Sequence, residues 1–167
     1  MNIEENMMLA TRRTKKKTLK WGFNKEDREA CVNKLKSLNL GLENRLEQKV
    51  GLLSGGQRQA VTLLMATIQR PDILLLDEHT AALDPKTAKV VLELTSKIVE
   101  EEKITTLMIT HNMRDAIKYG NRLIMLNEGR VIFDISGEEK KNLTVQELLE
   151  KFEKDDDIQL DDKMILG

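Results

Sequence analysis

The feature that most constrains the fold is a change of pattern after residue 70. Pro71-Asp72 interrupts a helical pattern, and the next residues, Ile73–Leu76, form a short continuous apolar run. Such a run after a proline turn predicts a strand buried on both faces. Beyond it the chain alternates between strand-like and helical segments. This alternation predicts an α/β fold with a mostly parallel sheet and right-handed crossovers.

The segments before residue 70 have helical spacing of apolar residues, and they predict helices over Lys25–Leu38 and from Ser54 to Arg70. A helix is also expected from Asp84-Pro85, because aspartate is a good cap and proline suits a first turn. The remaining expected elements are strands at Thr105–Ile109, Arg122–Leu126 and Val131–Ile135, and helices at Met113–Tyr119 and Thr144–Phe152.

Composition removes several classes of function. The 167 residues carry a formal net charge of -1, which gives no global attraction for nucleic acid. No apolar run approaches the roughly 20 residues of a spanning helix, and Met1–Ala10 does not look like a secretory signal. A basic stretch between Arg12 and Lys20 and an acidic tail from Asp155 to Asp162 are interpreted as solvated surface, and contact with lipid headgroups or a partner is the alternative for the basic stretch.

The segment Leu53-Ser54-Gly55-Gly56-Gln57 precedes a predicted helix. Ser54 and Gln57 fit an ordinary capping box, but a cap does not explain two glycines in a first turn. Glycines suit a place where something approaches the bare backbone. Because a helix N-terminus presents N–H groups to an anion, phosphate is the ligand that we weigh against the plain cap.

Two adjacent carboxylates, Asp77 and Glu78, follow the predicted strand Ile73–Leu76. They would repel each other unless each is compensated separately. One can hold Mg²⁺ and the other can polarise an attacking water, while the alternative is a plain polar loop. His111 follows Thr105–Ile109 and is expected at the same sheet edge as Glu78. His79 is given less weight because its neighbours already explain the loop.

Together and in order, these segments resemble the ATP-hydrolysing subunits of ABC transporters. Leu53–Gln57 matches their LSGGQ sequence, and Ile73–Glu78 resembles their Walker B strand with its catalytic glutamate. Ala82–Pro85 looks like their D-loop, and His111 falls at their switch histidine. The loop from Glu78 to Asp84 further resembles a bacterial branch linked to amino-acid import, of the tryptophan or tyrosine type. His79 departs from the family, in which many members carry proline there.

The resemblance implies a set of roles at sites that bind ATP and Mg²⁺. Glu78 would polarise the hydrolytic water, His111 would contact the γ-phosphate and Asp77 would position Mg²⁺. Ser54, Gly55, Gly56 and Gln57 would cover ATP held by an opposite subunit, and Asp84 would communicate across that dimer. The implied partners are a second ATPase subunit, a transmembrane permease and a substrate-binding protein, with no nucleic acid. The implied location is cytoplasmic and peripheral on the inner face of the cell membrane.

The chain also departs from the family pattern. It contains no G-x-x-x-x-G-K-S/T segment, and the family's Q-loop is not identifiable. We therefore expect the C-terminal portion of such a subunit, with a partial P-loop NTPase fold. Residues 1–70 would form an incomplete helical subdomain, 71–153 the C-terminal half of the sheet core, and 154–167 an acidic tail. Thr105–Ile109 is then expected to expose an unpaired apolar edge, which would lower stability and favour aggregation.

Three functions are compatible with these residues. The first is the ATP-hydrolysing subunit of an importer of amino acids or similar small solutes. The second is a non-catalytic module that meets only a partner's ATP or a partner subunit, because the main ATP-gripping loop is not present. The third, an ATPase of chromosome or repair machinery, is disfavoured because the sequence has no heptad-rich coiled-coil arm.

Overall fold

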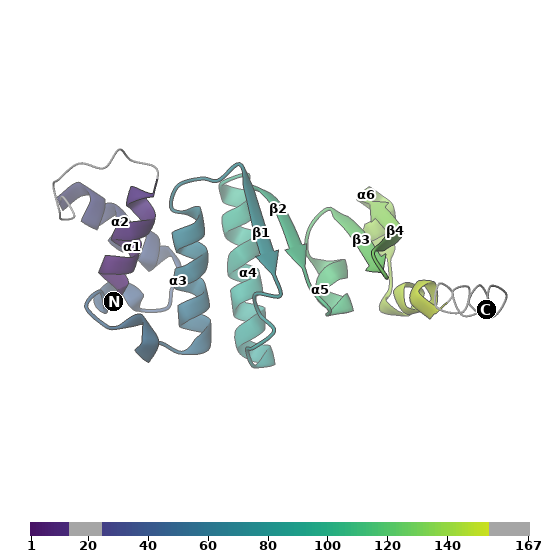
Figure 1. Ribbon diagram of the computed structural model, residues 1–167, viewed down its shortest axis with the longest axis horizontal. Coiled ribbons are helices and arrows are strands. Elements are labelled where there is room, and N and C mark those ends of the chain that lie inside the picture. Colours follow the sequence, from purple (N-terminus) through teal and green to yellow (C-terminus); the bar gives the residue numbers. More distant parts are fainter. Residues whose placement is uncertain (14–24, 154–167) are drawn as a thin grey trace. The chain divides into compact units, whose positions relative to one another are not determined.

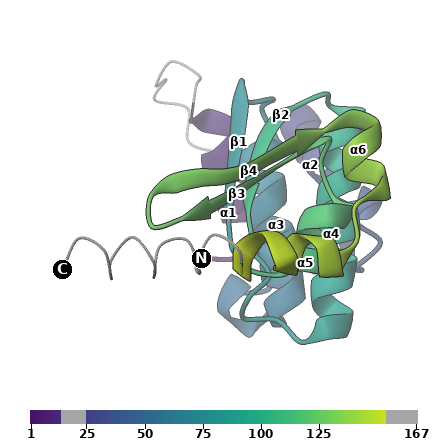
Figure 2. The same ribbon diagram turned by 90° about the vertical axis from the view of Figure 1, so that its right-hand side faces the viewer.

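The computed structural model describes residues 1–13 and 25–153. Most of the basic stretch after Arg12 and the whole acidic tail from Asp155 lie outside these residues. The chain divides into two compact units, Met1–Ile109 and Thr110–Gly167. The elements of both are labelled in Figures 1 and 2. Among the described residues, no helix is both long and apolar enough to cross a membrane. The predicted domain boundary at residue 70 stays a prediction.

The first unit begins with a helical layer. Its members are α1 (Ile3–Arg12), α2 (Lys25–Ser37), α3 (Gly55–Thr67) and two short 3-10 helices, η1 (Leu42–Asn44) and η2 (Val50–Leu52). The predicted helices α2 and α3 are confirmed, with ends that fall within a few residues of those expected. Helix α1 was not predicted, although Asn2 and Glu5 form a complete capping box at its start. Its residues Ile3 and Met7 are fully buried in the core.

The second layer of this unit is a βαβ arrangement of β1 (Ile73–Asp77), α4 (Pro85–Glu101) and β2 (Thr105–Ile109). Strands β1 and β2 pair in parallel, with Leu75 opposite Leu107 and Asp77 opposite Ile109. The predicted parallel pairing and the α/β class are confirmed. Figure 1 shows α3, α4 and the two strands in succession along the unit.

The prediction that the first strand is buried on both faces is wrong. Leu74 and Leu76 are buried against Leu63 of α3 and Ile104, with Leu94 and Ile98 of α4 nearby. Ile73 and Leu75, on the other face, are 54% and 66% exposed. The reason is that the helices packed on this sheet, α3 and α4, cover the same face. A continuous apolar run therefore occurs here in a strand with one open face.

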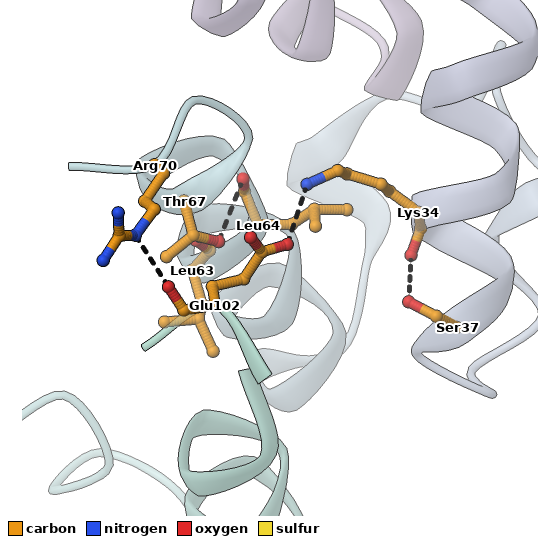
Figure 3. A network of polar contacts seen from close by, with 7 residues as sticks. All are labelled: Lys34, Ser37, Leu63, Leu64, Thr67, Arg70 and Glu102. Atoms are coloured by element: carbon orange, nitrogen blue, oxygen red, sulfur yellow. Dashed lines mark hydrogen bonds and ion pairs between the residues drawn. The ribbon is translucent and has the colours of Figure 1, made fainter. Parts of the chain in front are cut away.

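Polar contacts connect the C-terminal end of α4 to α2 and α3 (Figure 3). The guanidinium group of Arg70 donates from Nε to the carbonyl of Glu102 at 2.7 Å and from Nη2 to that of Lys103 at 2.8 Å. Lys34 of α2 lies 3.5 Å from the carboxylate of Glu102. Glu102 and Lys103 directly follow the last residue of α4, so Arg70 supplies donors to carbonyls at the exit of this helix.

The second unit contains α5 (Met113–Lys118), β3 (Arg122–Asn127), β4 (Arg130–Ser136), α6 (Gly137–Asn142) and a helix over residues 145–153. Strands β3 and β4 form an antiparallel hairpin, so the parallel pairing of β1 and β2 does not extend to them. The cause is the two-residue turn Glu128-Gly129, because so short a connection can join only antiparallel strands. Both turn residues have positive φ, which matches the twist of a hairpin.

Candidate functional site at the start of helix α3 and the end of strand β1

The first turn of α3 is a complete capping box. The Ser54 hydroxyl accepts from the Gln57 N–H at 3.3 Å, and the Gln57 side chain accepts from the Ser54 N–H at 3.2 Å. The predicted cap is thus confirmed. It leaves the N–H groups of Gly55 and Gly56 as the first-turn donors that such a helix offers to a ligand.

Packing within the chain accounts for Gly56. This residue is buried, and a methyl group in place of its hydrogen would overlap Cγ2 of Thr87 on α4. Gly55 is exposed, and a methyl group there would lie 2.9 Å from Cδ2 of Leu83. The close approach of α4 therefore gives Gly56 a reason within the chain itself, since the body that approaches its backbone is Thr87. The approach of a phosphate to Gly55 and Gly56 stays a prediction.

Asp84 caps α4, as predicted. Its carboxylate accepts from the Thr87 N–H at 3.0 Å, and Pro85 takes the first helical position. Hydrogen bonds from the side chain and then the backbone of Thr87 lower the pKa of Asp84, so the capping carboxylate is ionised at neutral pH. Because Thr87 also contacts Gly56, the start of α3 and the start of α4 are fixed against each other.

Asp77 and Glu78 lie where β1 ends, and both are exposed. Glu78 leaves the strand with a φ of 42°, a backbone conformation that few non-glycine residues adopt. Its N–H donates to the carbonyl of Ile109 at 3.0 Å, and its carbonyl accepts from the Ala81 N–H at 2.9 Å. The backbone therefore leaves the strand at Glu78, and the two separate roles expected for Asp77 and Glu78 stay a prediction.

His111 follows the end of β2 by two residues and belongs to the second unit. It is exposed and lies beside Asn112, which caps α5 and whose N–H donates to the Thr110 hydroxyl at 3.0 Å. The meeting of His111 with Glu78 that was expected from the sequence stays a prediction.

His79, which received little weight from the sequence alone, makes a contact with a different element of the unit. Its ring is half-buried, and Nε2 lies 3.3 Å from the hydroxyl of Thr95 on α4. Burial lowers the pKa of His79, so the ring is neutral at pH 7. The one sequence signal was the departure at this position from the proline of many family members.

Within residues 1–13 and 25–153, no group of three or more His, Cys, Asp or Glu side chains could hold a metal by itself. Mg²⁺ in phosphate-transferring sites commonly uses one or two carboxylates together with phosphate oxygens and water. Asp77 fits that minimal role, and the free N–H groups at the start of α3 fit a phosphate. The donors described here therefore suit Mg²⁺ only together with a nucleotide.

Two features of the site occur together in this unit: a helix start that contains two glycines, and a strand that ends in two carboxylates. The chain is similar to the ABC transporter family, whose model matches residues 1–81. It is 50% identical over 153 residues to the "Tyrosine transport ATP-binding protein" of Clostridioides difficile, covering 92% of this chain and 61% of that protein. It is 35% identical to the "Zinc uptake system ATP-binding protein ZurA" of Listeria innocua, covering 86% of this chain and 54% of that protein.

The solved structure of a metal-chelate type ABC transporter in an inward-facing conformation has the same fold. The two superpose with a TM-score of 0.73 at 25% identity, covering 92% of this chain and 59% of that one. The chain therefore spans about three fifths of the length of the tyrosine transport protein and of this solved chain.

Proposed function

We propose that this chain belongs to the ATP-binding and ATP-hydrolysing subunit that energises an ABC importer. The observation that carries the proposal is that one compact unit contains both chemical elements and ties them together. The start of α3 contacts Leu83 and Thr87, and the same connection leads back to Glu78 at the end of β1. A movement of the start of α3 would therefore shift the end of β1.

The proposed roles follow the family pattern. Asp77 positions Mg²⁺, Glu78 polarises the attacking water and His111 contacts the γ-phosphate. Ser54, Gly55, Gly56 and Gln57 cover a nucleotide held by a second subunit, with the backbone N–H groups of the two glycines as donors. Asp84, which is already committed to capping α4, transmits the position of that helix across the dimer.

The proposed substrate is an amino acid or a similar small solute. The support is that relatives are named for the transport of tyrosine, for methionine import and for phosphonates import. The proposed partners are a second ATPase subunit, a transmembrane permease and a substrate-binding protein. The subunit would then work on the cytoplasmic face of the membrane.

One observation favours a second function, a module that binds only a partner's ATP. The 167 residues contain no G-x-x-x-x-G-K-S/T loop, which grips the phosphates in P-loop enzymes. On this alternative, the start of α3 still meets a nucleotide, but the second subunit holds it.

The first test is titration of the chain with Mg·ATP in a calorimeter, together with a phosphate-release assay. Neither binding nor turnover is expected from the chain alone. Tight binding with turnover that Glu78→Gln abolishes would contradict this expectation, because it would reveal an ATP grip outside the family pattern.

The second test separates the two functions. The tyrosine transport protein of Clostridioides difficile is changed to arginine at the residue aligned with Ser54, so that it can bind ATP but cannot cover it. Addition of this chain should restore phosphate release, and addition of its Ser54→Arg variant should not. A Glu78→Gln variant that restores as much turnover as the unchanged chain would support the non-catalytic module. No restoration by any variant would contradict both proposals.

A further inference from the structure

The ring of His79 is one of the points at which the loop from Glu78 to Leu83 touches the body of the unit. This ring is half-buried, whereas Ala81 and Ala82 beside it are exposed. Its Nε2 lies 3.3 Å from Oγ1 of Thr95, sixteen residues further along the chain on α4. A side chain that reaches back from an exposed loop to a buried hydroxyl attaches the loop at one defined point.

The hydrogen of Thr95 decides the direction of this bond. Thr95 donates its one hydroxyl hydrogen to the carbonyl of Val91 at 2.8 Å, one turn earlier on α4. Its oxygen can therefore only accept from the histidine. The neutral ring of His79 must then carry its hydrogen on Nε2 and leave Nδ1 as the unprotonated nitrogen.

The anchor itself is held by the core. Thr95 is 5% exposed, and its neighbour Val91 on the same helix is 2% exposed. Leu94 and Ile98 pack against buried residues of both hydrophobic clusters of the first unit. Thr95 therefore has little freedom to follow the loop, so the loop must conform to it.

The residue that needs such support is Glu78. It has a positive φ of 42°, and its backbone bonds to Ile109 and to Ala81. A non-glycine residue keeps such a conformation only where its surroundings specify it more than once. The bond from the next residue, His79, to α4 is a third constraint, and it comes from a different element.

We propose that His79 is a positioning residue, which holds the backbone of Glu78 in its turned conformation through the bond from its Nε2–H to the hydroxyl of Thr95. The consequence for catalysis, a fixed direction for the Glu78 carboxylate, rests on the proposed function. The attachment itself does not, and it can be tested without nucleotide.

The chain offers a matched control for this bond. Thr67 on α3 is 2% exposed and donates to the carbonyl of Leu63 at 2.9 Å, as Thr95 does to Val91, and the other carbonyl near its hydroxyl, that of Leu64, belongs to the same helix. Thr67→Val thus removes a buried helix-internal hydroxyl contact alone. Thr95→Val removes the same kind of contact and the histidine bond as well, whereas Thr95→Ser keeps both.

The experiment uses the ¹⁵N-labelled full chain at neutral pH. The ring nitrogens of His79 should show the Nε2–H form. Water-exchange NMR should show the Ala81 amide, which donates to Glu78, exchanging at least about tenfold faster in Thr95→Val and His79→Ala. Thr95→Ser and Thr67→Val should leave that rate unchanged.

An Nδ1–H ring in the unchanged protein would overturn the proposal without any variant, so it stays testable even if a variant fails to fold. Equal exchange at Ala81 in Thr95→Val and Thr67→Val would overturn it as well. If exchange responds as expected but Glu78→Gln supports full phosphate release with the relative described above, the role of Glu78 in hydrolysis fails and the anchor stands.

Discussion

At the scale of the residue, the side chain of Thr87 limits the size of the residue that position 56 can accept. Gly56→Ala should destabilise the chain by about 1–2 kcal/mol, because overpacking costs more than the roughly 1 kcal/mol that alanine gains in a helix. Thr87→Ser removes the methyl group that clashes and leaves Cβ at 3.7 Å, so the double variant should recover that loss. Urea unfolding followed by circular dichroism measures each step.

Gly51→Ala is the control for this cycle, because nothing lies within 4 Å of the position where its methyl group would be. Its unfolding midpoint should stay close to that of the unchanged chain. If Gly56→Ala lost no stability, or if Thr87→Ser failed to rescue it, the close approach of α4 would not be what limits this position.

His79 gives the chain a pH dependence of known sign. Burial lowers its pKa in the folded state below the ordinary value near 6.5, so the unfolded chain binds the proton more readily. The contribution to stability is therefore complete above about pH 6.5 and is lost as the pH falls through the folded pKa. His79→Gln cannot titrate, so its unfolding midpoint should fall less than that of the unchanged chain between about pH 7 and pH 5. Parallel curves for the two proteins would contradict this.

At the scale of the element, the guanidinium group of Arg70 binds the carbonyls at the exit of α4. Arg70→Ala should cost about 1–2 kcal/mol, because the carbonyls of Glu102 and Lys103 lose their bonds to the guanidinium group. Arg70→Lys keeps the charge but cannot present two donors in one plane, so it should recover only part of the loss. Urea unfolding of both variants measures the effect. A lysine variant as stable as the unchanged chain would mean that charge alone matters here.

The elements themselves were largely predictable, and the reasons are local. Periodicity identified α3 and α4, and a proline turn before an apolar run identified β1. Helix α1 was missed although its signals are local, since Asn2 and Glu5 form a capping box and Ile3, Met7 and Ala10 fall at helical spacing. Met1–Ala10 was considered only as a possible secretory signal.

Long-range contacts explain what the sequence could not show at the candidate site. The identities of Ser54, Gln57 and Asp84 as caps depend on residues three positions away, so local reasoning found them. The need for glycine at position 56 comes from Thr87, and the partner of His79 is Thr95. The two residues of each pair are far apart in the sequence, and only the folded chain brings them together. The open face of β1 likewise depends on which helices pack against it.

At the scale of the whole molecule, the first unit has an apolar sheet face that its own described residues leave exposed. Ile73 and Leu75 of β1 and Leu107 and Ile109 of β2 share one face by their register, and each is more than half exposed. Within the described residues, β1 and β2 pair only with each other, so backbone groups at the sheet edges also lack strand partners. Apolar surface next to open strand edges favours association between chains.

We therefore expect the purified chain to self-associate as its concentration rises, in line with the lower stability predicted from its sequence. Leu75→Lys with Leu107→Lys should shift sedimentation toward the monomer, because lysines on an open sheet face resist pairing. Leu52→Lys is the control, since Leu52 is 72% exposed on η2, away from the sheet. A monodisperse monomer with a sharp cooperative melt would contradict the prediction. If Leu52→Lys dissociated the chain as well as the double variant does, added charge would be responsible rather than the sheet face.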